Sequence, residues 1–286
     1  MLTGNGPSRV HFTGRGGLPS YRRMKSILLL AAACVLSATP AFARDFCPDR
    51  PGIDTPPCTV EPGKLSVEIS GADWTHDVAS DVVSDTVLLG DLALRYGIAE
   101  HAEVRVGWTP FGHSHVRDRQ SGAVQNLSGV GDLTIGIKRN LVDPDGKSFS
   151  IALLPSVSLP TGGMAIGAGD WGAGLQVPVS VPLGHVVTLL LTPEIDAAVD
   201  GDRSGRHLAY GTEGGLGIAA SDKLNIAVEG AVMRDDDPGG ASTREIIGVA
   251  AGLMLGDNTQ VDMGSEFGLN HASPDRRVYV GIARRF

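Results

Sequence analysis

From Leu65 to the end of the chain, apolar side chains recur at every second position. Between Leu224 and Val232, for example, the large apolar residues share one parity, while Asn225 and Glu229 share the other. Successive side chains of a β-strand point to opposite faces of a sheet, whereas an amphipathic helix repeats every 3.6 residues. The pattern therefore predicts strands with one apolar face and one face of small or polar residues.

About twelve segments carry this alternation. Most are about 10 to 13 residues long, which exceeds an ordinary soluble strand and matches a tilted strand that crosses a bilayer. The segments are 65–74, 85–97, 102–110, 129–140, 148–159, 170–182, 186–198, 207–219, 224–234, 243–255, 259–270 and 276–286.

The connections between these segments alternate in length. Short turns at 98–101, 142–147, 183–185, 220–223 and 256–258 alternate with longer or more polar connections at 75–84, 111–128, 161–169, 199–206, 235–242 and 271–275. Outer-membrane barrels have short periplasmic turns and longer external loops, and a sheet in lipid must close because an open edge leaves backbone groups unpaired. We therefore predict an all-β fold over 65–286: a transmembrane, antiparallel, up-and-down β-barrel of about twelve strands.

Periodicity alone does not separate this arrangement from a water-soluble barrel, and the N-terminus supplies a further argument. Residues 24–43 have a positive start, an apolar run from Ile27 to Leu36 and the cleavage signal Ala41-Phe42-Ala43, which together are typical of a secretory signal peptide. The alternatives are a single membrane anchor and a lipidated Cys34. We expect 1–23 to be an upstream extension without a fold, and 44–64 to be a periplasmic segment with no long plug.

Composition excludes several other classes. The formal charge of −8 and a pI near 5.4 argue against a nucleic-acid binder, which would need a basic surface. After signal cleavage only Cys47 and Cys58 remain. In an oxidising periplasm these two residues favour a disulfide, and metal binding is the alternative.

The polar parity of the strands predicts which charged side chains face the barrel interior. They are Glu68, Asp91, Arg95, Glu103, Arg105, Asp132, Lys138, Glu194, Glu213, Glu229, Arg244, Asp262, Glu266 and Arg277. Two interpretations remain open: a paired network that fills the barrel, or a permeation path whose acidic excess favours cations or neutral solutes. A loop such as 111–128 could fold inward and close such a path.

By the same register, Trp74, Trp108 and Trp171 fall at external strand ends, and Phe286 falls at a periplasmic end. Amphipathic aromatic rings favour the level of the lipid headgroups. We therefore expect these four side chains at the membrane interface.

Candidates for chemistry are few. His113-Ser114-His115 could supply two metal ligands or a serine–histidine pair of a lipid hydrolase, or it could be a plain solvated loop. Other histidines, among them His207, also fall near the external rim. The run from Asp235 to Asp237 lacks the spacing of an EF-hand and fits a solvated tip that could bridge divalent ions to lipopolysaccharide. We predict no catalytic residue, no cofactor and no bound metal.

Several stretches resemble known proteins. The last strand, 277–286, alternates and ends on an aromatic residue, as do the C-terminal strands of Gram-negative outer-membrane proteins that the barrel-assembly machinery recognises. The stretches 62–68, 129–138 and 159–163 resemble a family of outer-membrane transporters named for the meta-pathway of phenol degradation. The resemblance covers roughly 45–286.

The resemblance implies a barrel in contact with outer-membrane lipid and lipopolysaccharide. It also implies passive passage of small molecules, often aromatic or hydrophobic, while the particular substrate does not carry over. The alternatives are an outer-membrane lipid hydrolase and a structural or adhesive barrel.

Overall fold

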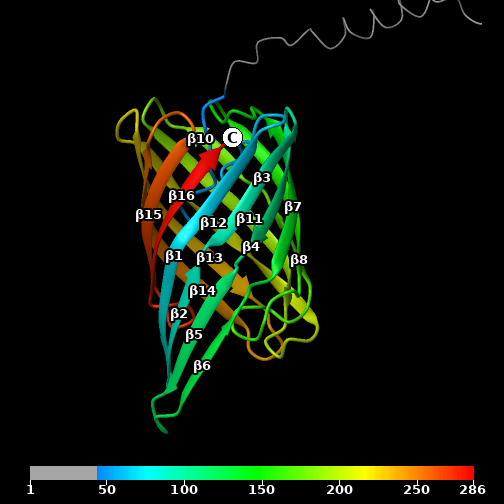
Figure 1. The fold of residues 1–286 in the computed structure, drawn as a ribbon, viewed down its shortest axis with the longest axis vertical. Coiled ribbons are helices and arrows are strands. Elements are labelled where there is room, and N and C mark those ends of the chain that lie inside the picture. The colour runs from blue at the N-terminus through cyan, green and yellow to red at the C-terminus, as the bar shows by residue number, and fades with distance from the viewer. Residues whose placement is uncertain (1–43) are drawn as a thin grey trace, which may run out of the picture. The chain divides into compact units, whose positions relative to one another are not determined.

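The computed structural model describes residues 44–286, which form a closed β-barrel (Figure 1). The predicted upstream extension at 1–23 and the predicted signal peptide at 24–43 lie outside the described residues. Among the described residues, no helix is both long enough and apolar enough to cross a membrane.

All the strand segments belong to one antiparallel sheet. The segments are β1 (Leu65–Ala79), β2 (Val82–Leu89), β3 (Asp91–Ala99), β4 (Ala102–Trp108), β5 (Phe111–Asp118), β6 (Val124–Gly129), β7 (Leu133–Val142), β8 (Ser150–Leu159), β9 (Gly172–Gln176), β10 (Val179–Pro182), β11 (Val187–Val199), β12 (Arg206–Ala219), β13 (Leu224–Asp235), β14 (Ser242–Met254), β15 (Thr259–Gly268) and β16 (Arg276–Arg285).

Four barrel strands are interrupted and appear as two segments each: β2 with β3, β4 with β5, β6 with β7, and β9 with β10. Gly90, with φ of +72°, separates β2 from β3, and Pro178, which has no N–H to donate, separates β9 from β10. Joining each pair leaves twelve strands, and β16 pairs with β1 to close the ring. The predicted twelve-stranded antiparallel barrel is confirmed.

The two faces of the wall differ as the alternation predicts. Large apolar side chains such as Ile135 (42% exposed) and Val280 (43%) cover the outside. The fully buried side chains of the interior include Arg95, Lys138 and Glu103. A water-soluble protein would bury the aliphatic side chains instead, so this arrangement fits a barrel whose solvent on the outside is lipid.

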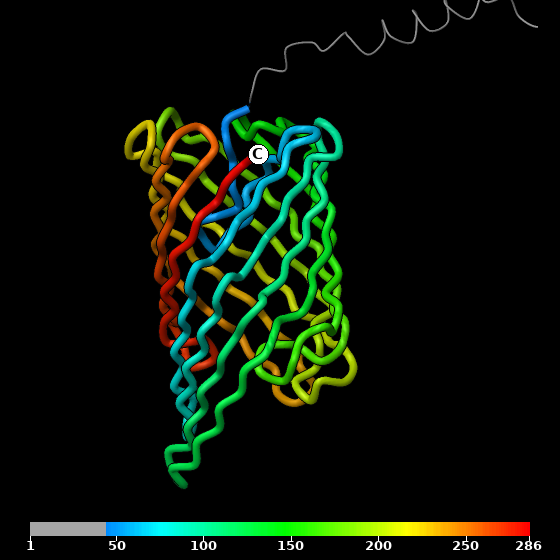
Figure 2. Tube along the Cα trace, in the orientation of Figure 1, coloured from blue at the N-terminus to red at the C-terminus, as the bar shows by residue number. Residues whose placement is uncertain are grey.

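Phe286 lies at one end of the barrel, here called the terminal end (Figure 2). Arg44 lies at the same end, because its backbone carbonyl accepts a hydrogen bond from Arg285 at 2.8 Å. The longer connections lie at the opposite end, here called the loop end. Two connections predicted as loops, 75–84 and 111–128, are mostly wall: β1 continues to Ala79, and β5 and β6 form a hairpin that projects beyond the neighbouring strands (Figure 1). Those predictions were wrong because polar residues occupy both parities of β5 and β6, so these strands lack the alternating apolar signal.

Candidate functional site: the lumen and its N-terminal plug

Residues 49–60, here called the plug, lie inside the barrel. Backbone and side-chain groups of this stretch hydrogen-bond to β1, β4, β7, β9, β11, β13 and β15. Because partners come from strands all around the ring, the plug crosses the lumen. The expectation of a periplasmic segment without a plug is therefore wrong for 49–60: about 21 residues are enough because the chain needs to cross the lumen only once.

Asp49 holds the plug to a buried group of charges. Its carboxylate forms ion pairs with Arg95 (3.1 Å), Lys138 (2.9 Å) and Arg105. Glu103 pairs with Arg95 at 2.8 Å. Glu68 also pairs with Arg95, at 3.0 Å, and accepts hydrogen bonds from the backbone N–H groups of Asp49 and Arg50. Three cations thus face three carboxylates, here called the Asp49 cluster, and the plug supplies one of the six. The sequence predicted the five wall residues as lumen-facing but missed Asp49, which lies outside any periodic segment.

On the other side of the lumen, the plug is held mainly through its backbone. Glu229 accepts the N–H of Ile53 at 3.0 Å, and Thr192 exchanges two hydrogen bonds with the backbone of Thr55, both of 3.2 Å. Arg50 forms an ion pair with Asp262 at 2.8 Å. Strand carboxylates and hydroxyls therefore satisfy plug groups that would otherwise be unpaired in the interior.

A glycine makes room for this approach. A Cβ on Gly281 would lie 2.4 Å from Nη2 of Arg50, so the glycine leaves the space that the guanidinium occupies where it reaches Asp262. Glycine in the strand thus has a packing reason that the alternating pattern alone does not reveal.

Cys47 and Cys58 form a disulfide that brackets most of the plug, with 11 residues of sequence separation. The backbone carbonyl of Cys58 accepts hydrogen bonds from both Arg95 and Lys138, at 3.3 Å each. The cross-link therefore keeps the loop of the plug short and directs its ends toward the Asp49 cluster.

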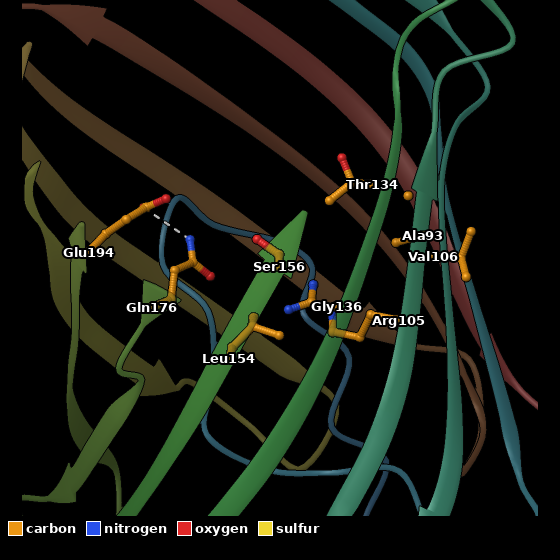
Figure 3. A pocket seen from close by; sticks show the side chains of 10 residues that line it. Ala93, Arg105, Val106, Thr134, Gly136, Leu154, Ser156, Gln176 and Glu194 are labelled. Atoms are coloured by element: carbon orange, nitrogen blue, oxygen red, sulfur yellow. Dashed lines mark hydrogen bonds between the residues drawn. The ribbon is translucent and has the colours of Figure 1, made fainter. Parts of the chain in front are cut away.

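A cavity of about 190 Å³ lies beside the plug (Figure 3). Its lining combines small residues with five polar side chains: Arg105, Thr134, Ser156, Gln176 and Glu194. Gln176 donates a hydrogen bond to Glu194 at 3.0 Å. A concave space with a few convergent polar groups is the usual form of a small-molecule site.

Charge is distributed unevenly around the lumen. The cations Arg95, Arg105 and Lys138 come from the neighbouring strand segments β3, β4 and β7. The opposite half of the ring supplies acids from β11 to β15: Glu194, Asp196, Glu213, Glu229, Asp262 and Glu266. Within residues 44–286, neither Glu194 nor Glu229 forms an ion pair; they bind Gln176 and plug N–H groups instead. The lumen therefore has a basic wall and an acidic wall, which the residue count alone did not predict.

The remaining predicted lumen residues lie nearer the loop end. Asp91 accepts a hydrogen bond from Thr109 at 2.6 Å. Arg277 joins Asp73 to Glu266. Arg244 is exposed and lies opposite Met233 in the ladder. The sequence missed Asp73, because an irregularity between Ser70 and Ala72 shifts the parity of β1.

Asp132 fixes the connection 160–171, here called the inner loop. Its carboxylate accepts the N–H groups of Gly162 (2.7 Å) and Ala168 (2.6 Å). Ile166 of this loop packs on Gly112, where a Cβ would lie 2.4 Å from the isoleucine Cδ1. Gly112 shares its ladder row with Leu88 and the buried Asp73, so this contact is on the inner face. The segment that folds inward is therefore 160–171 and not 111–128, which is part of the wall.

The four predicted interface aromatics occupy different settings. Trp108 (38% exposed), Trp171 and Phe286 are exposed. Trp171 carries the guanidinium of Arg206 over its ring, at 3.7 Å from the centroid. Trp74 is half-buried and donates a hydrogen bond to Asp85 at 3.0 Å, because β1 continues past it.

The structure separates the residues of the histidine motif. In the sheet, His113 lies opposite Val87, which pairs with Trp74, and His115 lies opposite Asp85, which pairs with His76. Ser114 lies between them opposite Thr86, on the inward-facing row. His113 contacts Ser128 at 2.8 Å, and His115 contacts Asn126 at 2.7 Å. Neighbouring residues of a strand point to opposite faces, so Ser114 does not pair with either histidine.

Solved structures with a similar fold are barrels of the outer membrane. The barrel is similar to the crystal structure of the COG4313 outer membrane channel from Pseudomonas putida F1, with 15% identity, 87% of this chain and 100% of that chain covered, and a TM-score of 0.62. It is also similar to the translocator domain of the autotransporter NalP from Neisseria meningitidis, with 15% identity, 93% and 96% coverage, and a TM-score of 0.51. At this identity both likenesses show the fold alone.

A search of curated proteins found no relative that matches the sequence. Residues 48–286 match the family described as "Putative MetA-pathway of phenol degradation". The match begins immediately before the plug and runs through the last strand. The chain therefore belongs to this family.

Proposed function

We propose that the protein is an outer-membrane channel for small molecules, closed in this conformation by its N-terminal plug. The observation that carries the proposal is a polar interior inside an apolar wall, with a cavity of about 190 Å³ beside the plug. The acidic wall adds to this, because its carboxylates Glu194 and Glu229 bind an amide and plug N–H groups in place of cations and keep their negative charge.

The solute class follows from the charges. Glu194, Glu213 and Glu229 give the lumen an acidic side, which favours cationic or neutral solutes over anions. The family description names phenol degradation. Small aromatic molecules are therefore the first neutral solutes to test.

The location and partners belong to the same proposal. Exposed aliphatic rows would face lipid, and the exposed Trp108 and Trp171 would lie at the level of the headgroups and lipopolysaccharide. The strand that ends at Phe286 would be the segment that the barrel-assembly machinery recognises, and the termini would lie in the periplasm.

Planar-bilayer recording and liposome swelling test the proposal. The solutes are a neutral sugar, a cationic amine, an anionic sugar acid and phenol, each applied to the wild type and to Asp49→Asn. We expect faster uptake of neutral and cationic solutes than of the anion, and a larger conductance for Asp49→Asn. Absence of both conductance and uptake in wild type and variant would refute a channel.

A further inference from the structure

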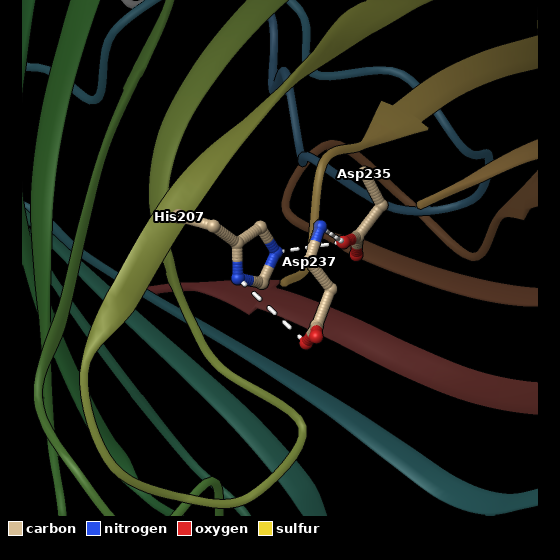
Figure 4. Close-up of side chains that lie close together, drawn as sticks. All are labelled: His207, Asp235 and Asp237. Atoms are coloured by element: carbon tan, nitrogen blue, oxygen red, sulfur yellow. Dashed lines mark hydrogen bonds and ion pairs between the residues drawn. The ribbon is translucent and has the colours of Figure 1, made fainter. Parts of the chain in front are cut away.

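At the loop end, away from the plug, a histidine and three aspartates converge on one point. His207 is the second residue of β12, Asp235 is the last residue of β13, and Asp237 follows in the next loop (Figure 4). One ligand atom from each of these three residues lies within 4.8 Å of the others. Asp200, from the loop before β12, contacts Nδ1 of the same imidazole at 2.9 Å.

His207 has a buried side chain and one ring nitrogen without a hydrogen-bond partner, as expected of a metal ligand and not of a solvated side chain. Its side chain is only 5% exposed. Nε2 lies 2.6 Å from Oδ1 of Asp235, yet the contact lacks hydrogen-bond geometry and this nitrogen is buried without a hydrogen-bond partner. A buried acceptor nitrogen beside a carboxylate oxygen is satisfied when both bind one cation.

Asp200 would orient the ring. Metal-binding histidines almost always donate their other ring N–H to a carboxylate or carbonyl, which fixes the tautomer and leaves the second nitrogen free for the ion. The contact between Asp200 and Nδ1 of His207 supplies that arrangement, with Nε2 turned toward Asp235. Oδ2 of Asp237 lies 3.8 Å from Nδ1 (Figure 4), and one of its oxygens remains within reach of the ring and of Asp235.

The nearby arginines do not neutralise this cluster. Arg206 pairs with Asp170 at 2.7 Å, and Arg234 pairs with Asp236 at 2.7 Å. The Arg203 guanidinium lies against Gly169. Among the described residues, no arginine pairs with the three carboxylates that surround this imidazole, so their charge is available to a bound cation.

Two backbone groups position the loop aspartate. The N–H groups of Gly239 and Gly201 donate to the Asp237 carboxylate, both at 2.5 Å. These bonds leave lone pairs on both oxygens, because each carboxylate oxygen accepts more than one bond.

We propose that His207, Asp235 and Asp237 bind a divalent transition-metal ion such as Zn²⁺, with Asp200 as the positioning residue for the imidazole. One nitrogen and carboxylate oxygens suit a first-row ion better than Mg²⁺ or Ca²⁺, which take oxygen ligands. The ion would join the start of β12 to the end of β13 and to the loop 236–241 at the mouth of the barrel. The site is independent of the proposed channel activity, since no plug or cavity residue takes part.

Calorimetric titration of ZnCl₂ into the full-length protein in detergent tests this site. Folding of each variant is checked by the change in its electrophoretic mobility when the sample is heated. We expect one Zn²⁺ per chain, affinity at least tenfold lower in His207→Gln and in Asp235→Asn, and unchanged affinity in His271→Gln. A Co²⁺-loaded wild type should show a visible absorption band that His207→Gln lacks.

Two outcomes would overturn the proposal. One is equal Zn²⁺ affinity in wild type and in folded His207→Gln, which would place the ion elsewhere. The other is no Zn²⁺ binding by the wild type, which would make the cluster an imidazolium clamp. Because binding is measured without any solute, a protein that fails to conduct still decides this test.

Discussion

Asp49→Asn perturbs the plug at its most highly charged contact. In the wild type, the Asp49 cluster balances three cations against three carboxylates, and the Arg95 and Lys138 side chains are fully buried. The substitution keeps the shape of the side chain but leaves one positive charge in excess. We therefore expect docking of the plug to weaken while the barrel strands keep their pairing.

The magnitude follows from the burial. Removing one partner of a buried ion pair costs about 3–5 kcal/mol, because the remaining charge stays desolvated. If that cost falls on the docked state, the ratio of released to docked plug rises about 100- to 5,000-fold, since each 1.4 kcal/mol is a factor of ten. Other contacts, such as the Arg50–Asp262 pair, still favour docking.

Hydrogen–deuterium exchange of the peptide that spans 47–60 measures this ratio. The matched control is Asp45→Asn, because Asp45 is 83% exposed and pairs only with the exposed Lys147. A surface pair contributes about 0–1 kcal/mol, so exchange in the control should rise no more than about fivefold. The double variant Asp49→Asn, Lys138→Met restores charge balance and should recover part of the protection. Equal exchange in Asp49→Asn and Asp45→Asn would refute the reasoning.

Three further perturbations have distinct readouts. Cys58→Ser removes the cross-link and should lower plug stability by about 2–4 kcal/mol, measured by the same exchange experiment; unchanged protection would contradict a role for the disulfide. Glu213→Gln should shift the reversal potential in a salt gradient toward anions, whereas Glu245→Gln, on the outward row with Val232, should not; identical shifts would remove the acidic wall as the selectivity element. Gly112→Leu should expel Ile166 and raise conductance in an Asp49→Asn background, and a conductance equal to that of the parent would show that the inner loop does not obstruct the path.

The sequence predicted the wall well because the wall is a local pattern. Each strand alternates between two environments, so Lys138 is assigned to the face opposite Ile135 and Ile137 from nearby residues alone. The strand number and the grouping of most charges on one face follow from that parity. The prediction failed where parity carries no information: in the polar hairpin of β5 and β6, and beyond the irregularity at Ser70 and Ala72.

The sequence by itself determined that the chain forms about twelve strands, each with one apolar face and one polar or charged face, because side-chain alternation is a property of neighbouring residues. Only the tertiary structure decided what fills the lumen and what lies at its rim. Arg50 meets Asp262 across 212 positions of sequence, and His207 meets Asp235 only because β12 and β13 pair. Such contacts depend on ring closure and strand register, so no local pattern in the plug or the loops encodes them.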